Sequence, residues 1–349
     1  MPAQETLTER QFRVLEGVIQ VYVESAQPAG SEAVSRRARL GISPASIRST
    51  MSELEARGYL YHAHTSGGRI PTERGYRIYV NRLMRPPTVS RSVRAKLEQE
   101  IAPAARNPIE EILRRAAQVL GVLTQELGVA VAPTLDRLLL ERLELVRLSE
   151  ERLLVVLTLQ SGVVRTIFVE IPGAVAAEAV EHVSRILNER LAGVALEEIR
   201  RSLSERLRDA SPASASSGGR ELLNIFVAEG EELFDFADPS SDLVLGSAQP
   251  LAEQPEFASN ERMKSLLELT ERRDVLRRAF EDRHRNGLTI TIGSENADPR
   301  LADFTLVTSP YRSGGLSGVI GVMGPIRMPY EKIIGLVEHT SRMVEGLMT

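Results

Sequence analysis

The chain has 349 residues, of which 42% are hydrophobic and 26% are charged, and it contains no cysteine. This composition is typical of a protein with two or three domains, and the lack of cysteine excludes disulfides, thiolate metal sites and cysteine nucleophiles. No uncharged apolar run approaches the ~18 residues of a membrane span, and the first residues lack the basic-then-apolar order of a signal peptide. We therefore expect a cytoplasmic protein with no membrane segment.

Charge is distributed unevenly along the chain. Residues 1–84 hold eleven arginines and eight glutamates, a net charge of +3, whereas the whole chain has a net charge of −4. A basic N-terminal module on an acidic body is the asymmetry expected of a nucleic-acid-binding protein with a separate regulatory part. A chance fluctuation would give the same numbers, so charge alone leaves both interpretations open.

The first predicted helix has signals at both ends. Thr8 and Gln11 can form a capping box at its start, and apolar residues from Phe12 to Tyr22 recur at helical spacing. The segment 27–30, with the sequence QPAG, ends the helix.

The next segments predict a helix-turn-helix. A short helix is expected over 32–39, followed by a tight turn around Gly41. Ser43 then serves as an N-cap with Pro44 in the first helical position, and the helix that they open ends at Gly58. Two short helices joined by a turn that contains glycine are typical of this motif.

The segment after the third helix predicts a wing. A strand over 59–64, a turn over 65–68 that holds two glycines, and a return strand from Arg69 to Pro71 follow in order. Thr72 then caps a further helix. These elements complete a winged helix-turn-helix domain over residues 1–85.

The remainder of the chain alternates between helical and strand-like segments. Strands before and after a helical middle, closed by a terminal helix, predict an α+β domain that contains an insertion. Helices are expected over 90–102, 108–127, 174–191, 195–209, 220–236, 261–284 and 330–347, and strands over 128–132, 138–148, 152–160, 163–171, 243–245, 288–292, 304–308 and 317–323.

Three strings in the N-terminal part carry a family resemblance: SPASIR at 43–48, HTSGGRIPT at 64–72 and GYRIYV at 75–80. With these strings in this order, the chain resembles the bacterial heat-inducible transcription repressor HrcA family. The resemblance implies a winged helix-turn-helix domain over 1–85, a GAF-like α/β domain formed by 89–171 and 259–349, and an inserted dimerisation domain over 172–258.

The resemblance also implies a function. Family members repress chaperone operons, bind an inverted-repeat operator in double-stranded DNA as homodimers at the nucleoid, and depend on chaperonin to stay active. After the position of Arg48 the family usually has Asn and an acidic residue, whereas this chain has Ser49 and Thr50. This departure puts the details of the operator preference in doubt, but not DNA binding.

The candidate DNA contacts come from the second and third helices and the wing. Ile47, Met51 and Leu54 share the packing face of the third helix, which leaves a small, polar opposite face that can approach base edges. Arginines near this face can contact phosphate, and wing glycines permit positive φ and close approach to the backbone. Taken singly, each feature also fits a solvated helix or an ordinary hairpin. The predicted contacts are Arg36, Arg37, Ser43, Ala45, Ser46, Arg48, Ser49, Ser52, His64, Ser66, Gly67, Gly68 and Arg69.

Two copies of the DNA-binding domain are needed to bind an inverted repeat, and we expect their contact within 172–258. Apolar residues at helical spacing supply a candidate surface there, although they could equally form the hydrophobic core of this domain within one chain. They are Val180, Val183, Leu187, Leu191, Leu223, Phe226, Leu233 and Phe234.

Evidence for chemistry is weak elsewhere in the chain. Tyr76 and Tyr79 are expected to pack in the core rather than stack on bases. Glycines at 315, 318, 321 and 324 match no phosphate loop and fit a strand against which another backbone packs closely. The five histidines show no metal-site spacing. We expect no catalytic residue, metal or cofactor. The alternative function is a metabolite-sensing winged-helix regulator whose GAF-like domain binds a small effector.

Overall fold

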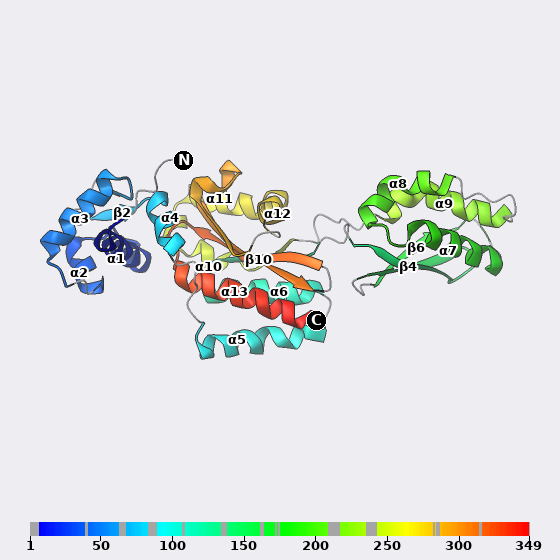
Figure 1. Ribbon diagram of the computed structural model, residues 1–349, viewed down its shortest axis with the longest axis horizontal. Helices are drawn as coiled ribbons and strands as arrows, with labels where there is room; N and C mark the ends of the chain where they lie inside the picture. Colours follow the sequence, from blue (N-terminus) through cyan, green and yellow to red (C-terminus); the bar gives the residue numbers. More distant parts are fainter. Residues whose placement is uncertain are drawn as a thin grey trace. The chain divides into compact units, whose positions relative to one another are not determined.

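The computed structural model describes residues 7–38, 41–62, 68–82, 89–106, 109–133, 138–160, 164–171, 173, 175–208, 217–234, 243–281, 283, 287–313 and 316–348. Contacts between residues divide the chain into two units (Figure 1). Helices and strands are both abundant, in agreement with the expected α+β class. Among the described residues, no helix is long and apolar enough to cross a membrane. The first unit comprises 1–132, 243–311 and 318–348, and the second comprises 133–242 and 312–317.

We refer to residues 7–82 of the first unit as the head. Its elements follow the predicted order, with bounds close to those expected. They are α1 (Glu9–Ser25), α2 (Ser31–Ala38), α3 (Pro44–Ala56), β1 (Leu60–His62), β2 (Arg69–Pro71) and α4 (Glu73–Arg82). The β1 and β2 strands pair in antiparallel fashion, with Tyr61 opposite Ile70.

The local signals that predicted the head are confirmed as hydrogen bonds. The Thr8 amide donates to the Gln11 side chain at 3.1 Å, and the Thr8 hydroxyl accepts from the Gln11 amide at 3.2 Å. The Ser43 hydroxyl accepts from the Ser46 amide at 3.2 Å and caps α3. Gly41 has a φ of +67°, a left-handed conformation that glycine adopts without steric cost. The turn before α3 therefore depends on this glycine.

The rest of the first unit, from residue 89 onward, is referred to as the body. Its described strands form one sheet in the order β7-β3-β10-β9-β8. The strands are β3 (Leu127–Val131), β7 (Leu243–Leu245), β8 (Thr289–Ile292), β9 (Phe304–Ser313) and β10 (Leu316–Pro325). The body also contains short helical turns between its longer elements: η1 (Ala102–Arg106), α10 (Gln249–Ala252), η3 (Pro255–Phe257), η4 (Gly293–Glu295) and η5 (Pro299–Leu301).

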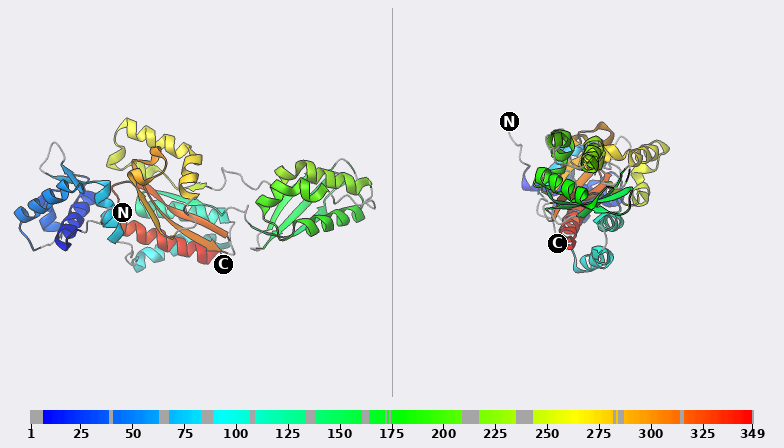
Figure 2. Two further views of the ribbon diagram at one scale, coloured as in Figure 1. Left: turned by 45° about the horizontal axis from the view of Figure 1, so that its top comes forward. Right: turned by 90° about the vertical axis from the view of Figure 1, so that its right-hand side faces the viewer.

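Helices cover both faces of the body sheet (Figures 1 and 2). On one side lie α5 (Arg91–Ile101), α6 (Ile109–Thr124) and α13 (Tyr330–Leu347), and on the other lie α11 (Asn260–Glu271) and α12 (Arg273–Glu281). One helix was predicted over 261–284, but the structure breaks it at Arg272, where neither glycine nor proline marks the break. The sequence therefore offered no local signal for this interruption.

Neighbouring residues of β3 belong to different cores because side chains alternate across a sheet. Ala130 packs with the α6 and α13 side, whereas Val129 and Val131 pack with the α11 and α12 side. The expected close approach of another backbone to the strand glycines is confirmed at Gly321, where an added side chain would meet the carbonyl oxygen of Val307. Gly315 lies outside the described residues.

The second unit has its own antiparallel sheet in the order β4-β5-β6. Its strands are β4 (Leu140–Arg147), β5 (Arg152–Leu159) and β6 (Val164–Glu170), and its helices are α7 (Ala177–Leu191), α8 (Leu196–Arg208) and α9 (Ser217–Leu233). The α7 helix packs on β4 and also contacts α8 and α9. Asn188 on α7 accepts a hydrogen bond from the Leu143 amide at 2.8 Å, which ties this helix to the sheet.

The limits of the two units differ from the predicted limits of the insertion. The strands over 138–171 were assigned to the same domain as the body strands, yet they pair only with one another among the described strands. Residues 243–258, assigned to the insertion, contain β7, which pairs with β3 of the body. Strand periodicity identifies strands but not their partners, so the sequence could not separate the two sheets.

Candidate nucleic-acid interface

The outward face of α3 is the centre of the candidate interface. Ala45, Arg48, Ser49 and Ser52 are exposed on it, whereas Ile47, Met51 and Leu54 are buried as predicted. Thr50 is also buried, and its hydroxyl donates to the Ser46 carbonyl at 3.1 Å. Of the two residues that depart from the family pattern, only Ser49 thus faces outward.

The N-terminal turn of α3 is held by side chains that the sequence identified and by one that it missed. The hydroxyls of Ser43 and Ser46 lie 3.1 Å apart, and Ser46 is half-buried. Arg10 on α1 donates to the Ser46 carbonyl at 3.2 Å. Ser43 and Ser46 therefore have a structural role in the cap, and Arg10 adds a cation near the start of α3.

The structure brings Arg48 and Arg69 to one hollow. This hollow has a volume of about 370 Å³ and lies between the start of α2, the outward face of α3 and the base of the β1–β2 hairpin. The Arg48 side chain is exposed, and no ion-pair partner for it is found in the described parts of the chain. Arg48 is thus available for an anionic group of a ligand.

Arg69, which was predicted to contact DNA, is engaged within the protein. Its Nε lies 2.8 Å from Oε2 of Glu55 on α3, and its side chain is only 14% exposed. Its backbone also pairs with Ala29, with N–O distances of 2.9 and 3.0 Å. Arg69 therefore clamps the hairpin to α3, and the sequence analysis missed Glu55 as its partner.

Gly68 is needed for packing rather than for a positive φ. A Cβ at this position would lie 2.7 Å from the carbonyl carbon of Pro28, and Gly68 is not among the described glycines with positive φ. The predicted contacts His64, Ser66 and Gly67 lie outside the described residues. The base of the hairpin is thus packed against the segment that precedes α2.

The two arginines of α2 have different surroundings. Arg37 pairs with Glu24 on α1, with its Nε 3.1 Å from Oε1, and both side chains are about half exposed. This hydrogen bond from Arg37 lowers the pKa of the Glu24 carboxyl. Arg36 is exposed, and the part of the chain that the structure describes supplies it with no ion-pair partner. Arg36 is therefore the less restrained of the two.

Comparisons with known proteins identify the family. The model of the HrcA protein C terminal domain matches residues 110–334. The heat-inducible transcription repressor HrcA of Chlorobium chlorochromatii (strain CaD3) is 37% identical over 346 residues, covering 98% of each chain. That of Chlorobium phaeobacteroides (strain BS1) is 38% identical over 343 residues, covering 95% of this chain and 96% of the relative. This chain belongs to the HrcA family.

Members of the HrcA family are transcription repressors rather than enzymes. A solved structure titled "Crystal structure of a hypothetical protein at 2.2 A resolution" has the same fold, with a TM-score of 0.62 and 22% identity over 99% of both chains. No cluster of three metal-binding side chains occurs among the residues that the structure describes.

In this HrcA-family chain the head is fastened to the body through α4. Arg77 on α4 donates to the Ile290 carbonyl at 2.8 Å and from Nε to Glu295 Oε1 at 2.7 Å. Glu73 accepts from the Ser294 amide at 3.1 Å. Tyr76 packs against Tyr330, with ring centroids 5.6 Å apart. The prediction that Tyr76 lies in the core is confirmed, and that core continues into the body.

Proposed function

We propose that this protein represses transcription by binding an inverted-repeat operator in duplex DNA as a homodimer. The head is the winged helix-turn-helix domain, with α3 as the recognition helix and the β1–β2 hairpin as the wing. The observation that carries this proposal is the exposed, small-residue face of α3 on the net-positive part of an HrcA-family chain. Arg48 lies at the edge of this face and has no ion-pair partner among the described residues. A bulky face could not approach base edges in the major groove.

The other contacts in the proposal have separate roles. Ala45, Ser49 and Ser52 approach the bases, and Arg48 binds a base or a phosphate. Arg36 and Arg37 bind phosphates, for which Arg37 exchanges its exposed partner Glu24. Such phosphate contacts position the protein without specifying a sequence. Because the proposed operator is part of the genomic DNA, the protein is proposed to lie in the cytoplasm, at the nucleoid.

The body is proposed as the GAF-like domain and the second unit as the dimerisation domain. Among the apolar residues expected at the dimer contact, Val180, Val183 and Leu187 are buried within their own unit, so they are not free to contact a second copy. The face of the β4-β5-β6 sheet that none of the described helices covers replaces them in the proposal. On this face Leu154 of β5 lies between Val146 of β4 and Phe168 of β6.

This sheet face carries an exposed apolar patch beside the exposed Arg142–Glu144 ion pair, and the patch is the part proposed to bind a second copy. Phe168 is 59% exposed and Val146 is 42% exposed. Leu148, directly after β4, and Val164 at the start of β6 add exposed apolar surface. Contiguous exposed apolar patches mark interaction sites in water-soluble proteins. A two-fold contact that pairs this face with itself would bring two heads to one operator.

Control by heat is proposed to act through folding. Warming unfolds or separates the repressor, and a single half-site binds too weakly to hold it. Chaperonin refolds the protein until heat-damaged clients occupy it. This part of the proposal is supported by the family resemblance. It predicts that, after heating, chaperonin with nucleotide raises the fraction of protein that titrates with operator, and an unchanged fraction would contradict it.

The experiment that tests DNA recognition selects bound sequences from a random duplex pool with purified protein. The expected result is an inverted repeat with a fixed spacing between half-sites. Arg48→Ala should weaken binding to the selected site, whereas Arg91→Ala, an exposed arginine on α5 of the body, serves as the matched control. Selection of no common sequence, or full binding by the Arg48→Ala variant, would contradict the proposal.

A further inference from the structure

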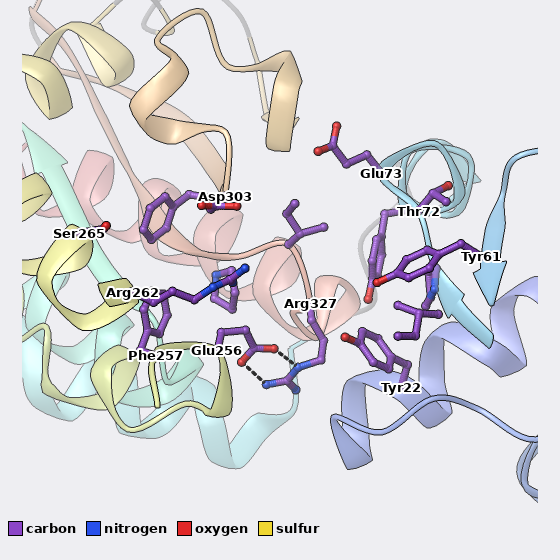
Figure 3. A pocket seen from close by; sticks show the side chains of 16 residues that line it. Tyr22, Tyr61, Thr72, Glu73, Glu256, Phe257, Arg262, Ser265, Asp303 and Arg327 are labelled. Atoms are coloured by element: carbon purple, nitrogen blue, oxygen red, sulfur yellow. Dashed lines mark hydrogen bonds and ion pairs between the residues drawn. The ribbon is translucent and has the colours of Figure 1, made fainter. Parts of the chain in front are cut away.

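A cavity of about 380 Å³ lies between the head and the body within the first unit (Figure 3). Its walls come from α1, the β1–β2 hairpin and α4 on one side and from η3, α11, η5 to β9 and the end of β10 on the other. This volume falls within the range of small-molecule sites. No function proposed so far uses this cavity.

One wall of the cavity is apolar. Phe257 and Phe304 are nearly buried, and their rings stack with centroids 5.9 Å apart and planes inclined by 20°. Ile70 and Ile326 also line the cavity. This wall can accept the flat or aliphatic part of a small organic molecule.

The hydroxyl of Tyr76 is the observation that points to a ligand. Tyr76 lines the cavity and is 1% exposed, and its hydroxyl has no hydrogen-bond partner among the described residues. Burial raises the pKa of Tyr76, so the hydroxyl keeps its proton and remains a donor. Buried polar groups without a partner are rare in folded proteins. A bound group that accepts a hydrogen bond would satisfy it.

Further donors surround the same space. Arg262 extends into the cavity from α11, and Tyr22 and Tyr61 direct their hydroxyls toward it from the head (Figure 3). None of these three side chains has a hydrogen-bond or ion-pair partner among the residues that the structure describes. Arg327, in contrast, has partners. Its Nη2 donates to Oε2 of Glu256 at 2.8 Å, and its Nη1 donates to the Val23 carbonyl at 2.7 Å.

Carboxylates limit where an anion can bind. Glu73 and Asp303 lie at the end of the cavity away from Tyr22 and Arg327 (Figure 3). Glu73 is engaged by the Ser294 amide at 3.1 Å. The Glu256 carboxylate also lines the cavity, but it is engaged by Arg327. An anionic group is therefore expected between Arg262 on the body side and the tyrosine hydroxyls on the head side, away from Glu73 (Figure 3).

We propose that this cavity binds a small organic anion, with its carboxylate or phosphate on Arg262 and the tyrosine hydroxyls and its apolar part on Phe257 and Phe304. Arg262 supplies charge, and the tyrosines supply neutral donors. A ligand in this position touches head and body together and stabilises their contact. The proposal goes beyond DNA binding and does not depend on it.

The test titrates benzoate or phenyl phosphate into the full-length protein without DNA, and calorimetry measures the heat of binding. Each probe joins one anionic group to one apolar ring, and molecules of this size bind with Kd values of about 1 mM. The expected result is saturable binding of one probe or both at one site per chain, and the preferred probe identifies the anionic group. No saturable binding of either probe up to about 10 mM would overturn the proposal.

Variants locate the site. Arg262→Gln should weaken binding about ten-fold, the effect of losing one charge-assisted hydrogen bond, whereas Lys264→Gln on the same helix should bind as the unchanged protein does. Tyr76→Phe should weaken binding, with Tyr79→Phe as its control. Equal binding by the Arg262→Gln and Lys264→Gln variants would overturn the assignment. Inorganic phosphate binding as tightly as phenyl phosphate would overturn the role of the apolar wall.

The Tyr76 hydroxyl gives a second, independent readout. Without a probe, Tyr76→Phe should leave the Tm unchanged or raise it, because the variant removes a buried hydroxyl that has no partner. With a saturating probe, the variant should show a smaller rise in Tm than the unchanged protein. A fall in the Tm of the probe-free variant would show that the hydroxyl stabilises the fold and would overturn its role as a ligand donor.

Discussion

Arg69 at the base of the wing and Glu55 on α3 form an ion pair, with Nε 2.8 Å from Oε2. The pair joins the two elements that are proposed to contact DNA, and it is largely shielded from solvent on the arginine side, where the side chain is 14% exposed. The spacing between the β1–β2 hairpin and α3 is therefore set by contacts within the protein itself. Arg69 thus holds the β1–β2 hairpin against α3 through Glu55.

This clamp predicts coupling between the two residues. In a double-mutant cycle with Arg69→Ala and Glu55→Ala, we expect a coupling free energy of about 1 kcal/mol in unfolding, a value limited by the partial exposure of Glu55. Denaturant unfolding of the four proteins measures it. Strictly additive effects would show that the two side chains do not stabilise each other and would contradict the clamp.

Arg48 and Arg69 are predicted to differ in the salt dependence of operator binding. Arg48→Ala should cost about 1–3 kcal/mol on the operator alone if Arg48 binds a base, or flatten the salt slope by about one unit on every sequence if it binds a phosphate. Arg69→Ala should weaken binding with little change in slope. Plots of the logarithm of the binding constant against the logarithm of the salt concentration distinguish these outcomes. Unchanged operator binding by the double variant would contradict the proposed DNA-binding surface.

The turn before α3 predicts a selective cost for a side chain at Gly41. Gly41→Ala should lower the free energy of unfolding by about 1 kcal/mol, because the φ of +67° at this position is unfavourable for residues other than glycine. Gly30→Ala is the control, since Gly30 has no positive φ and an added Cβ there meets nothing within 4 Å. Equal effects of the two substitutions in denaturant unfolding would exclude backbone strain as the cause.

The exposed sheet face of the second unit predicts the dimer contact. Phe168→Glu should convert the dimer to a monomer without unfolding it, because the side chain is 59% exposed in one chain. Operator affinity should fall with the loss of the second half-site. Sedimentation gives the mass, and Glu205→Lys on the exposed side of α8 is the control. A dimer that persists in the Phe168→Glu variant would place the contact elsewhere.

Buried Glu126 predicts a pH-dependent stability. Burial raises the pKa of this carboxyl well above 4.5, although Gln254 donates to its Oε2 at 3.0 Å. The folded protein therefore holds a proton that the unfolded chain releases, so this group lowers the free energy of unfolding as the pH rises above about 4.5. Glu126→Gln should stabilise the protein at neutral pH and flatten this decline, as measured by unfolding at several pH values. The exposed Glu98→Gln should change neither.

The sequence by itself determined the head, because its signals act between close neighbours along the chain. The Thr8–Gln11 capping box, the Ser43 cap and the Gly41 turn each depend on groups a few residues apart, and all are present. The buried and exposed faces of α3 also follow from helical periodicity alone. The same locality identified the family strings around the wing.

Tertiary structure alone decided which distant groups meet. Glu55 pairs with Arg69 and Pro28 fills the space beside Gly68 only because the hairpin folds back on α3 and on the segment before α2. The strands over 138–171 were recognisable as strands, but their assignment to a separate sheet depends on hydrogen bonds between strands, which periodicity does not encode. The cavity beside Tyr76 likewise exists only where head and body elements come together.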